Sequence, residues 1–201
     1  MKTLIISGSG RAESASLRIS NWLNDELQTM GKESEVLDLH AAKLSLDMND
    51  LWGGDAGLGQ RWGAIKQQLT DADSYIFVTP EWNGMASPSL RVLLNYQGGE
   101  MAHKPAMLVG VSSGFGGRYP LAELRASSVK NTHLVYSPEQ LVVMQCGEML
   151  NEHLPIGTDS TDGHLQDRAR YALKILEQYA DALGKVRSSG VIDAVTYENG
   201  V

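Results

Sequence analysis

Short apolar segments and amphipathic segments alternate along the whole chain. The apolar segments are rich in Val, Ile and Leu, and each is bounded by polar or turn-forming residues. They cover residues 4–7, 36–39, 75–79, 107–111 and a run within 133–144. Parallel strands that are buried on both faces have continuous apolar runs rather than alternating ones. The pattern therefore predicts five buried strands in a parallel sheet with both faces covered.

Between these runs, apolar residues recur at offsets of three and four, which is the period of an amphipathic helix. This period covers residues 19–30, 58–69, 90–97, 121–129 and 165–183, and it is clearest in the last stretch. Gly31 is expected to end the first helix, and Pro88 lies near the first turn of the third. Five strands that alternate with five helices imply right-handed βαβ units and a doubly wound α/β fold.

The length and composition fit one folded unit. The chain has 201 residues, of which 42% are hydrophobic, and this is enough for one sizeable core. We expect one domain over residues 1–187 and a tail over 188–201, which has little to pack with and either frays or reaches a neighbouring subunit. Residues 51–59 contain four glycines, and we expect a mobile loop there.

The net charge and the cysteine content indicate which binding partners the protein lacks and in which cellular compartment it works. A net charge of −7 argues against general binding to nucleic acid or to an anionic membrane. No apolar run approaches the ~20 residues that cross a bilayer, and a strand starting at Lys2 leaves no room for a cleavable leader. The single cysteine, Cys146, fits a reducing cytoplasm, and its apolar surroundings predict a buried structural thiol. The histidines show no paired metal-ligand spacing, so we expect no metal.

The segment between the first strand and the first helix has the composition of an anion site. Residues 7–16 read Ser-Gly-Ser-Gly-Arg-Ala-Glu-Ser-Ala-Ser. Backbone N–H groups and the helix dipole at such a position favour a phosphate. Arg11 adds a positive charge with a planar fork that suits phosphate oxygens. The alternative is an ordinary strand-to-helix turn rich in Gly and Ser.

Two further loops follow the third and fourth predicted strands, at residues 80–88 and 112–118. In open parallel sheets, ligands bind beyond the carboxyl ends of the strands. Trp82 offers an aromatic surface, Asn83 a donor and an acceptor, and the glycines of the later loop allow close approach of main chain to a flat ligand. Each loop alone is equally a turn punctuated by Pro and Gly. Together they favour one elongated ligand, with an anion at the first loop and a planar ring between the other two.

Two motifs resemble those of a known family. Gly8-Ser9-Gly10-Arg11 with Ser14, and Pro80-Glu81-Trp82-Asn83-Gly84, are similar to motifs of the NAD(P)H-dependent FMN reductases, flavodoxin-like proteins that include quinone, chromate and azo-dye reductases. The resemblance covers residues 1–130. It implies a three-layer sandwich around a five-stranded parallel sheet of order 2-1-3-4-5. It also implies bound FMN, NADPH or NADH as electron donor, and a small acceptor such as a quinone, free flavin or azo compound.

The resemblance also assigns residues and a quaternary state. By matching position, the FMN phosphate would be held by Ser9, Arg11, Ser14 and Ser16. The isoalloxazine ring would be bordered, largely by backbone groups, at Pro80, Glu81, Trp82, Asn83 and Gly84, and its other edge would be lined by Ser112, Ser113 and Gly114. No side chain is assigned as a general acid or base. A homodimer or homotetramer is implied, with Trp52 and the helix over residues 88–97 as candidate contacts or, equally, as core.

Four positions depart from the family pattern. Ser16 stands where the family usually has Asn, Trp82 where it has Tyr, and Val92 and Asn95 where it has Asn and Asp.

Other functions remain open from the residues. A dinucleotide-binding Rossmann dehydrogenase would use Gly8-Ser9-Gly10 and a ribose-binding Asp38, but Glu13 occupies the third glycine position of that fingerprint. A flavodoxin-like electron carrier or a flavin-binding sensor would bind the same cofactor without turnover. Consumption of NADPH with a quinone acceptor separates an enzyme from both.

Overall fold

The computed structural model describes residues 1–44, 56–96 and 99–197. A five-stranded parallel sheet forms its middle layer, and the strand order is β2-β1-β3-β4-β5. The strands are β1 Lys2–Ser7, β2 Glu33–Asp38, β3 Ser74–Pro80, β4 Pro105–Val111 and β5 Val135–Val143. The predicted α/β class and strand order are confirmed. This order also differs from the 3-2-1-4-5-6 order of a Rossmann dehydrogenase.

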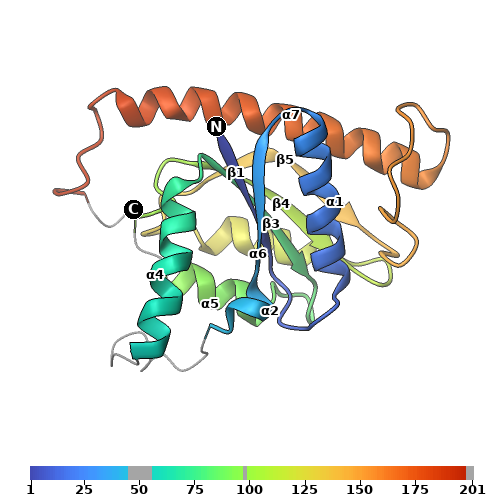
Figure 1. Ribbon diagram of the computed structural model, residues 1–201, viewed down its shortest axis with the longest axis horizontal. Helices are drawn as coiled ribbons and strands as arrows, with labels where there is room; N and C mark the ends of the chain where they lie inside the picture. The colour runs from blue at the N-terminus through green and yellow to red at the C-terminus, as the bar shows by residue number, and fades with distance from the viewer. Residues whose placement is uncertain (45–55, 97–98, 198–201) are drawn as a thin grey trace.

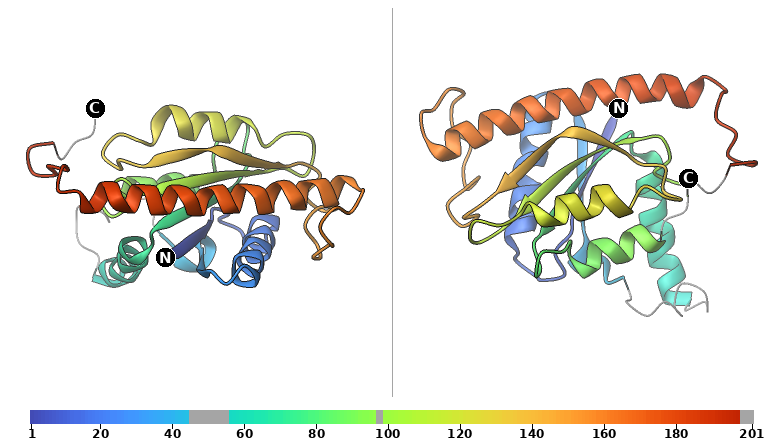
Figure 2. Two further views of the ribbon diagram at one scale, coloured as in Figure 1. Left: turned by 90° about the horizontal axis from the view of Figure 1, so that it is seen from above. Right: turned by 180° about the vertical axis from the view of Figure 1, so that it is seen from behind.

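Helices cover both faces of the sheet (Figures 1 and 2). They are α1 Ala15–Thr29, α2 Leu39–Ala42, α4 Ala56–Asp71, α5 Pro88–Tyr96, α6 Tyr119–Ser127 and α7 Thr161–Ser188. The first and last of these, α1 and α7, share one apolar core with the sheet, and the other four share a second core on the opposite face. No helix within the described ranges has the length and apolar character to span a bilayer.

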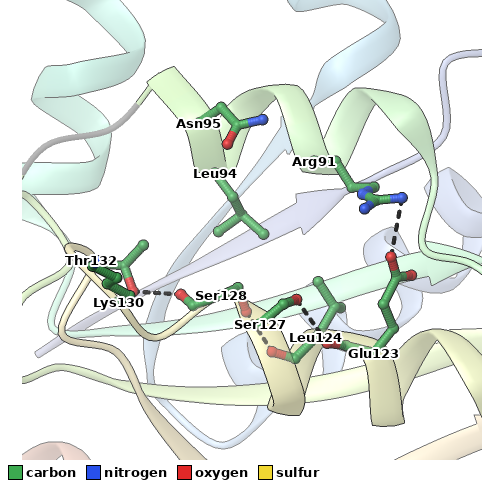
Figure 3. Close-up of a pocket in the computed structure, with 9 residues that line it drawn as sticks. All are labelled: Arg91, Leu94, Asn95, Glu123, Leu124, Ser127, Ser128, Lys130 and Thr132. Atoms are coloured by element: carbon green, nitrogen blue, oxygen red, sulfur yellow. Dashed lines mark hydrogen bonds and ion pairs between the residues drawn. The ribbon is translucent and has the colours of Figure 1, made fainter. Parts of the chain in front are cut away.

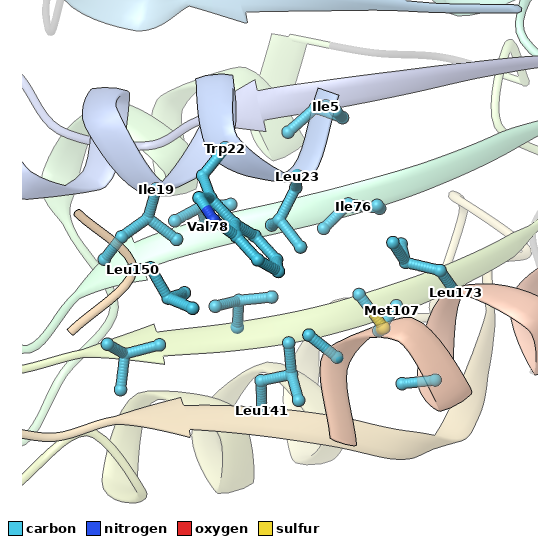
Figure 4. Close-up of a cluster of buried hydrophobic side chains, with 14 of the residues drawn as sticks. Ile5, Ile19, Trp22, Leu23, Ile76, Val78, Met107, Leu141, Leu150 and Leu173 are labelled. Atoms are coloured by element: carbon cyan, nitrogen blue, oxygen red, sulfur yellow. The ribbon is translucent and has the colours of Figure 1, made fainter. Parts of the chain in front are cut away.

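Side-chain alternation along each strand supplies both cores. In β1, Ile5 packs in the core with α1 and α7, whereas Leu4 and Ile6 pack in the core on the opposite face. Figure 4 shows the first of these cores, where Trp22 of α1 and Leu173 of α7 meet the strands. Each large apolar side chain so buried stabilises the fold by about 1.5–3 kcal/mol. This double burial explains why the strands have continuous apolar runs.

Some predicted boundaries and loops differ from the structure. Residues 51–55 of the predicted mobile loop, and Trp52 with them, lie outside the described residues, but residues 56–59 form the first turn of α4, so the loop prediction is wrong there. Helical glycines cost only about 1 kcal/mol each, which the rest of a helix can offset. The short helix α2 was not predicted, and Asp38 caps it by accepting the N–H of His40 at 3.1 Å. Cys146 is a buried free thiol, as predicted.

A buried ion network joins α1 to α7. Arg170 donates to both carboxylate oxygens of Glu26, each at 2.9 Å, and His153 Nδ1 lies 2.8 Å from Glu26 Oε1. Burial by itself raises the pKa of Glu26, but the hydrogen bonds with Arg170 and His153 outweigh it and hold the pKa below its ordinary value of 4.5. The carboxylate is therefore more stable in the folded chain than in the unfolded chain.

The sign of this shift gives a pH-dependent prediction. Because the folded-state pKa of Glu26 is depressed, its contribution is fully present above about pH 5 and is lost as the pH falls through the folded-state value. Glu26→Gln should lower the free energy of unfolding by about 3 kcal/mol at pH 7, and by less at pH 3.5. Urea unfolding at the two pH values measures this difference. Glu148→Gln, at an exposed position, is the control, and an equal loss for Glu26→Gln at both pH values would contradict the assignment.

Candidate functional site

Three loops meet at the carboxyl edge of the sheet. We call them loop 1 (residues 8–14, after β1), loop 2 (residues 81–87, after β3) and loop 3 (residues 112–118, after β4). Because β1, β3 and β4 are neighbours in the sheet, the loops that follow them emerge side by side. The edge therefore has the arrangement at which α/β proteins bind ligands.

Loop 1 leads into the N-terminus of α1, where several backbone N–H groups have no acceptor in the described part of the chain. Ser14 caps α1 by accepting the N–H of Leu17 at 3.1 Å, and Ser9 Oγ accepts the N–H of Arg11 at 3.2 Å. Within the described part of the chain, the backbone N–H groups of residues 12–16 donate to no protein acceptor. Arg11 is exposed and pairs with no carboxylate among those residues. Free N–H groups at a helix N-terminus beside a guanidinium are the donor set of a phosphate site.

Two serines beside this loop are buried. Ser7, the last residue of β1, is fully buried, and its hydroxyl has no hydrogen-bond partner among the described residues. An unsatisfied buried hydroxyl costs about 1–3 kcal/mol, and at the base of a phosphate-like loop it fits a missing ligand. Ser16 lies in the first turn of α1, is 1% exposed, and its carbonyl accepts the hydroxyl of Ser20 at 2.8 Å.

Loop 2 is fastened to loop 1 through Ser87. Its hydroxyl donates to the carbonyl of Gly8 and accepts the N–H of Leu90 at 3.3 Å, so the same oxygen caps α5. The N–H of Ser87 donates to Thr79 Oγ1 at 3.1 Å. The N–H of Gly8 in turn donates to Val78 O at 2.8 Å. A Cβ on Gly8 would lie 2.9 Å from Val78 O, which is why a glycine is required at this close approach.

The centre of loop 2 is a tight two-residue turn. Trp82 and Met85 exchange backbone hydrogen bonds at 3.0 and 2.9 Å, and Asn83 and Gly84 between them have φ of 52° and 80°. This is the positive-φ geometry that the Asn-Gly pair adopts readily. The turn leaves the side chains of Trp82 and Met85 exposed at 45% and 43%. The aromatic surface predicted at Trp82 is therefore present at the loop edge.

Glu81 fastens loop 2 to loop 3. Its N–H donates to Val111 O at 3.0 Å, and its carboxylate accepts the N–H of Gly117. A Cβ on Gly116 would lie 2.8 Å from the Glu81 carboxylate. The Glu81 side chain is thus engaged by loop 3, and only the backbone of Glu81 can face a ligand.

Loop 3 is also fixed on its far side. The N–H of Ser112 donates to Val143 O at 2.9 Å, and its carbonyl accepts the N–H of Cys146 at 3.0 Å. Gly114 accepts the N–H of Gln145 at 2.8 Å, and a Cβ on Gly114 would meet nothing within 4 Å. Ser113 beside it is exposed. Main chain at residues 113 and 114 therefore borders open space.

Two further side chains support these loops and were not predicted from sequence. Glu123 of α6 accepts the N–H of Ala86 at 2.6 Å and pairs with Arg91 at 3.0 Å. Arg18 of α1 donates to Met149 O at 2.9 Å, and also to the carbonyls of Leu150 and Cys146. Both contacts join segments that are distant in sequence, so no local pattern could have shown them.

A separate cavity of about 210 Å³ lies between α5 and α6 (Figure 3). Arg91, Leu94 and Asn95 line it from α5, and Glu123 lines it from α6. Two residues of α5 differ from the family pattern described above. Asn95 faces this cavity, whereas Val92 is buried beside Tyr96. An apolar residue suits position 92 because this position lies in the apolar core of the chain.

The comparisons with known proteins agree with this geometry. A family model described as NADPH-dependent FMN reductase matches residues 1–148. The chain belongs to the NADPH-dependent FMN reductase family. The predicted family, the oxidoreductase class, FMN as cofactor and NADPH or NADH as electron donor are therefore confirmed at the level of the family.

The relatives and structural neighbours of this FMN reductase family member include proteins whose names describe flavin-dependent enzymes. The FMN-dependent NADPH-azoreductase of Staphylococcus aureus (strain USA300) is 30% identical over 127 residues, which are 62% of this chain and 68% of the relative. The flavoenzyme NAD(P)H:(acceptor) oxidoreductase of Paracoccus denitrificans superposes with a TM-score of 0.63 at 18% identity, covering 92% and 97% of the two chains. The FMN-dependent NADH-azoreductase of Bacillus anthracis has a TM-score of 0.56 at 13% identity, covering 89% and 99%. These two structural likenesses show the shared fold.

The fastening of loop 1 to loop 2 gives a second prediction. Ser87→Ala removes the α5 cap and the bond to Gly8, so it should lower the free energy of unfolding by about 1–3 kcal/mol. Urea unfolding measures this loss. Ser127→Ala is the matched control, because the Ser127 hydroxyl donates only to the carbonyl of Glu123 one turn earlier. Equal stability of the two variants would contradict the role of Ser87.

Proposed function

We propose that this protein uses bound FMN to transfer electrons from NADPH or NADH to small acceptors such as quinones, free flavins or azo compounds. The observation that carries the proposal is the fastening of three loops at one sheet edge, with free donors at loop 1 and an exposed aromatic side chain on loop 2. The name of the Staphylococcus aureus relative, an FMN-dependent NADPH-azoreductase, supports azo compounds as one class of acceptor.

The phosphate of FMN fits the donors of loop 1. We propose Ser9, Arg11, Ser14 and Ser16 as its binding residues. The free N–H groups of residues 12–16 and the unpaired guanidinium of Arg11 supply positive potential there. The unsatisfied hydroxyl of Ser7 lies at the base of the same loop. A phosphate dianion would supply the acceptor oxygens that these clustered donors do not find within the protein.

The isoalloxazine ring fits between loops 2 and 3. We propose the backbone and exposed surfaces of residues 80–84 (Pro80, Glu81, Trp82, Asn83, Gly84) on one side and of Ser112, Ser113 and Gly114 on the other. Within the described part of the chain, the N–H groups of Asn83, Gly84 and Ser113 have no acceptor. FMN, when bound, supplies a ring that accepts a hydride and passes electrons on. Backbone donors at its edge favour negative charge on the ring, so the protein contributes position and electrostatics.

The wider assignments follow from the same proposal. We propose residues 1–187 as the FMN-binding domain, a homodimer or homotetramer as the assembly, and the cytoplasm as the compartment, where the free Cys146 thiol stays reduced. The exposed fractions of Val191, Val195 and Tyr197 are 76%, 91% and 72%, and these side chains are available to a neighbouring subunit. Light scattering of the eluting protein measures the assembly, and a monomer at micromolar concentration would contradict this part.

The direct experiment is an FMN titration followed by turnover. Purified protein with added FMN should show the absorption spectrum of a bound flavin, and it should oxidise NADPH in a quinone-dependent manner. Binding of FMN without NADPH oxidation would favour the electron carrier or sensor. Absence of FMN binding would reject the proposal.

Replacement of the phosphate anchor gives a third prediction. Arg11→Ala should weaken FMN binding by about 1–3 kcal/mol, because it removes a charged donor from the phosphate. Fluorescence titration with FMN measures the dissociation constant. Lys174→Ala removes the same charge from the exposed face of α7 and should leave FMN affinity unchanged. Equal affinities of the two variants would count against the phosphate site.

A further inference from the structure

Arg118 differs from most arginines of the chain in its partners. Four other described arginines form ion pairs with carboxylates, namely Arg91, Arg168, Arg170 and Arg187. Arg18 and Arg125 donate to backbone carbonyls at short distances. Arg118 is exposed, contacts Phe115 O at 3.5 Å and Met144 Sδ at 3.6 Å, and pairs with no carboxylate in the described ranges. In a chain with a net charge of −7, this is an uncompensated cation.

The position of Arg118 is fixed by the loop that carries it. It directly follows Gly117, whose N–H is held by the Glu81 carboxylate. The carbonyl of Arg118 accepts the N–H groups of Leu121 at 3.2 Å and Ala122 at 3.3 Å, which starts α6. The guanidinium therefore lies at the rim of the proposed flavin site and not on a free tail.

Arg11 and Arg118 lie on the two outer loops of the proposed flavin site, loop 1 and loop 3, with loop 2 between them. Arg11 follows β1 and Arg118 follows β4, with β3 between those strands. Neighbouring strands are about 4.8 Å apart, so the strands that lead to the two residues are separated by about 10 Å. If Arg11 holds the FMN phosphate, Arg118 remains available to a second anion.

Exposed aromatic side chains flank Arg118. Phe115 is 76% exposed and Tyr119 is 71% exposed. Tyr119 also lies beside the turn of loop 2, since a Cβ on Gly84 would be 3.9 Å from the Tyr119 Cβ. Aromatic faces stack on purine rings, and a guanidinium binds phosphate oxygens with two parallel hydrogen bonds. Together these groups match a ligand that carries an adenine ring and a phosphate chain.

We propose that Arg118, with Phe115 and Tyr119, binds the adenosine-phosphate half of the reduced nicotinamide dinucleotide and so sets the affinity for the electron donor. The inference rests on the proposed function, because the nicotinamide half must reach the flavin between loops 2 and 3. Arg118 attracts the donor phosphates, and the aromatic side chains provide stacking surface for the adenine. None of the three is required to hold FMN.

The test uses the FMN-loaded protein and its reduction by NADPH in a stopped-flow instrument. Arg118→Ala should raise the NADPH concentration that gives half the maximal reduction rate by about tenfold, with the maximal rate and the FMN dissociation constant unchanged. Arg118→Lys keeps the charge without the planar fork and should restore part of this loss. Arg168→Ala is the control for loss of one exposed arginine beside an exposed aromatic side chain, because Arg168 lies on α7 over the ring of Tyr171; it differs from Arg118 in its ion pair with Glu139.

Adenosine 5′-diphosphate serves as an independent probe without a nicotinamide ring. It should compete with NADPH for the wild-type protein without releasing flavin, and it should compete about tenfold less strongly for Arg118→Ala. An unchanged half-saturating NADPH concentration, or a parallel loss of FMN affinity, in Arg118→Ala would overturn the inference. Failure of the wild-type protein to bind FMN would instead overturn the proposed function.

Discussion

The site depends on hydrogen bonds between side chains and backbone that join the three loops to one another. Loops at a sheet edge are otherwise free to separate, since the strands constrain only their bases. Ser87 connects loop 2 to Gly8, and Glu81 connects loop 2 to Gly117. Glu123 of α6 secures loop 2 at Ala86, and Arg18 of α1 donates to the carbonyl of Cys146, whose N–H in turn donates to Ser112 of loop 3. The consequence is a set of free N–H groups in fixed relative positions before any ligand binds.

This constraint explains why the glycines and the charged residues occur together. A Cβ on Gly8 would collide with the carbonyl oxygen of Val78 in β3, and a Cβ on Gly116 would collide with the Glu81 carboxylate of loop 2. Both glycines therefore permit the close contacts that the hydrogen bonds require. Arg11 of loop 1 and Arg118 of loop 3 follow β1 and β4, and loop 2, which carries the exposed Trp82, follows β3 between these two strands. Pre-positioned donors need not be ordered when a ligand binds, which favours binding.

The fold was predictable because it rests on local patterns. Five apolar runs specified the strands, and the double burial of β1 and β3 made those runs continuous. Loop positions followed from the alternation of elements. The roles of Glu81 and Glu123 were not predictable, since their partners are Gly117, 36 residues away, and Ala86, 37 residues away. The turn at Asn83-Gly84 was a missed signal, because that dipeptide favours positive φ at both positions.

Hydrogen exchange of the ligand-free protein, followed by NMR at single amides, tests most directly whether the loops are joined in advance. The account predicts slow exchange at the N–H groups of Gly8 and Gly117, which donate to Val78 and Glu81, and fast exchange at the free N–H groups of Asn83 and Ser113. Protection of the Gly117 amide should disappear in Glu81→Ala. Fast exchange at Gly8 and Gly117 until FMN is added would show that the ligand assembles the loops, and it would contradict the account.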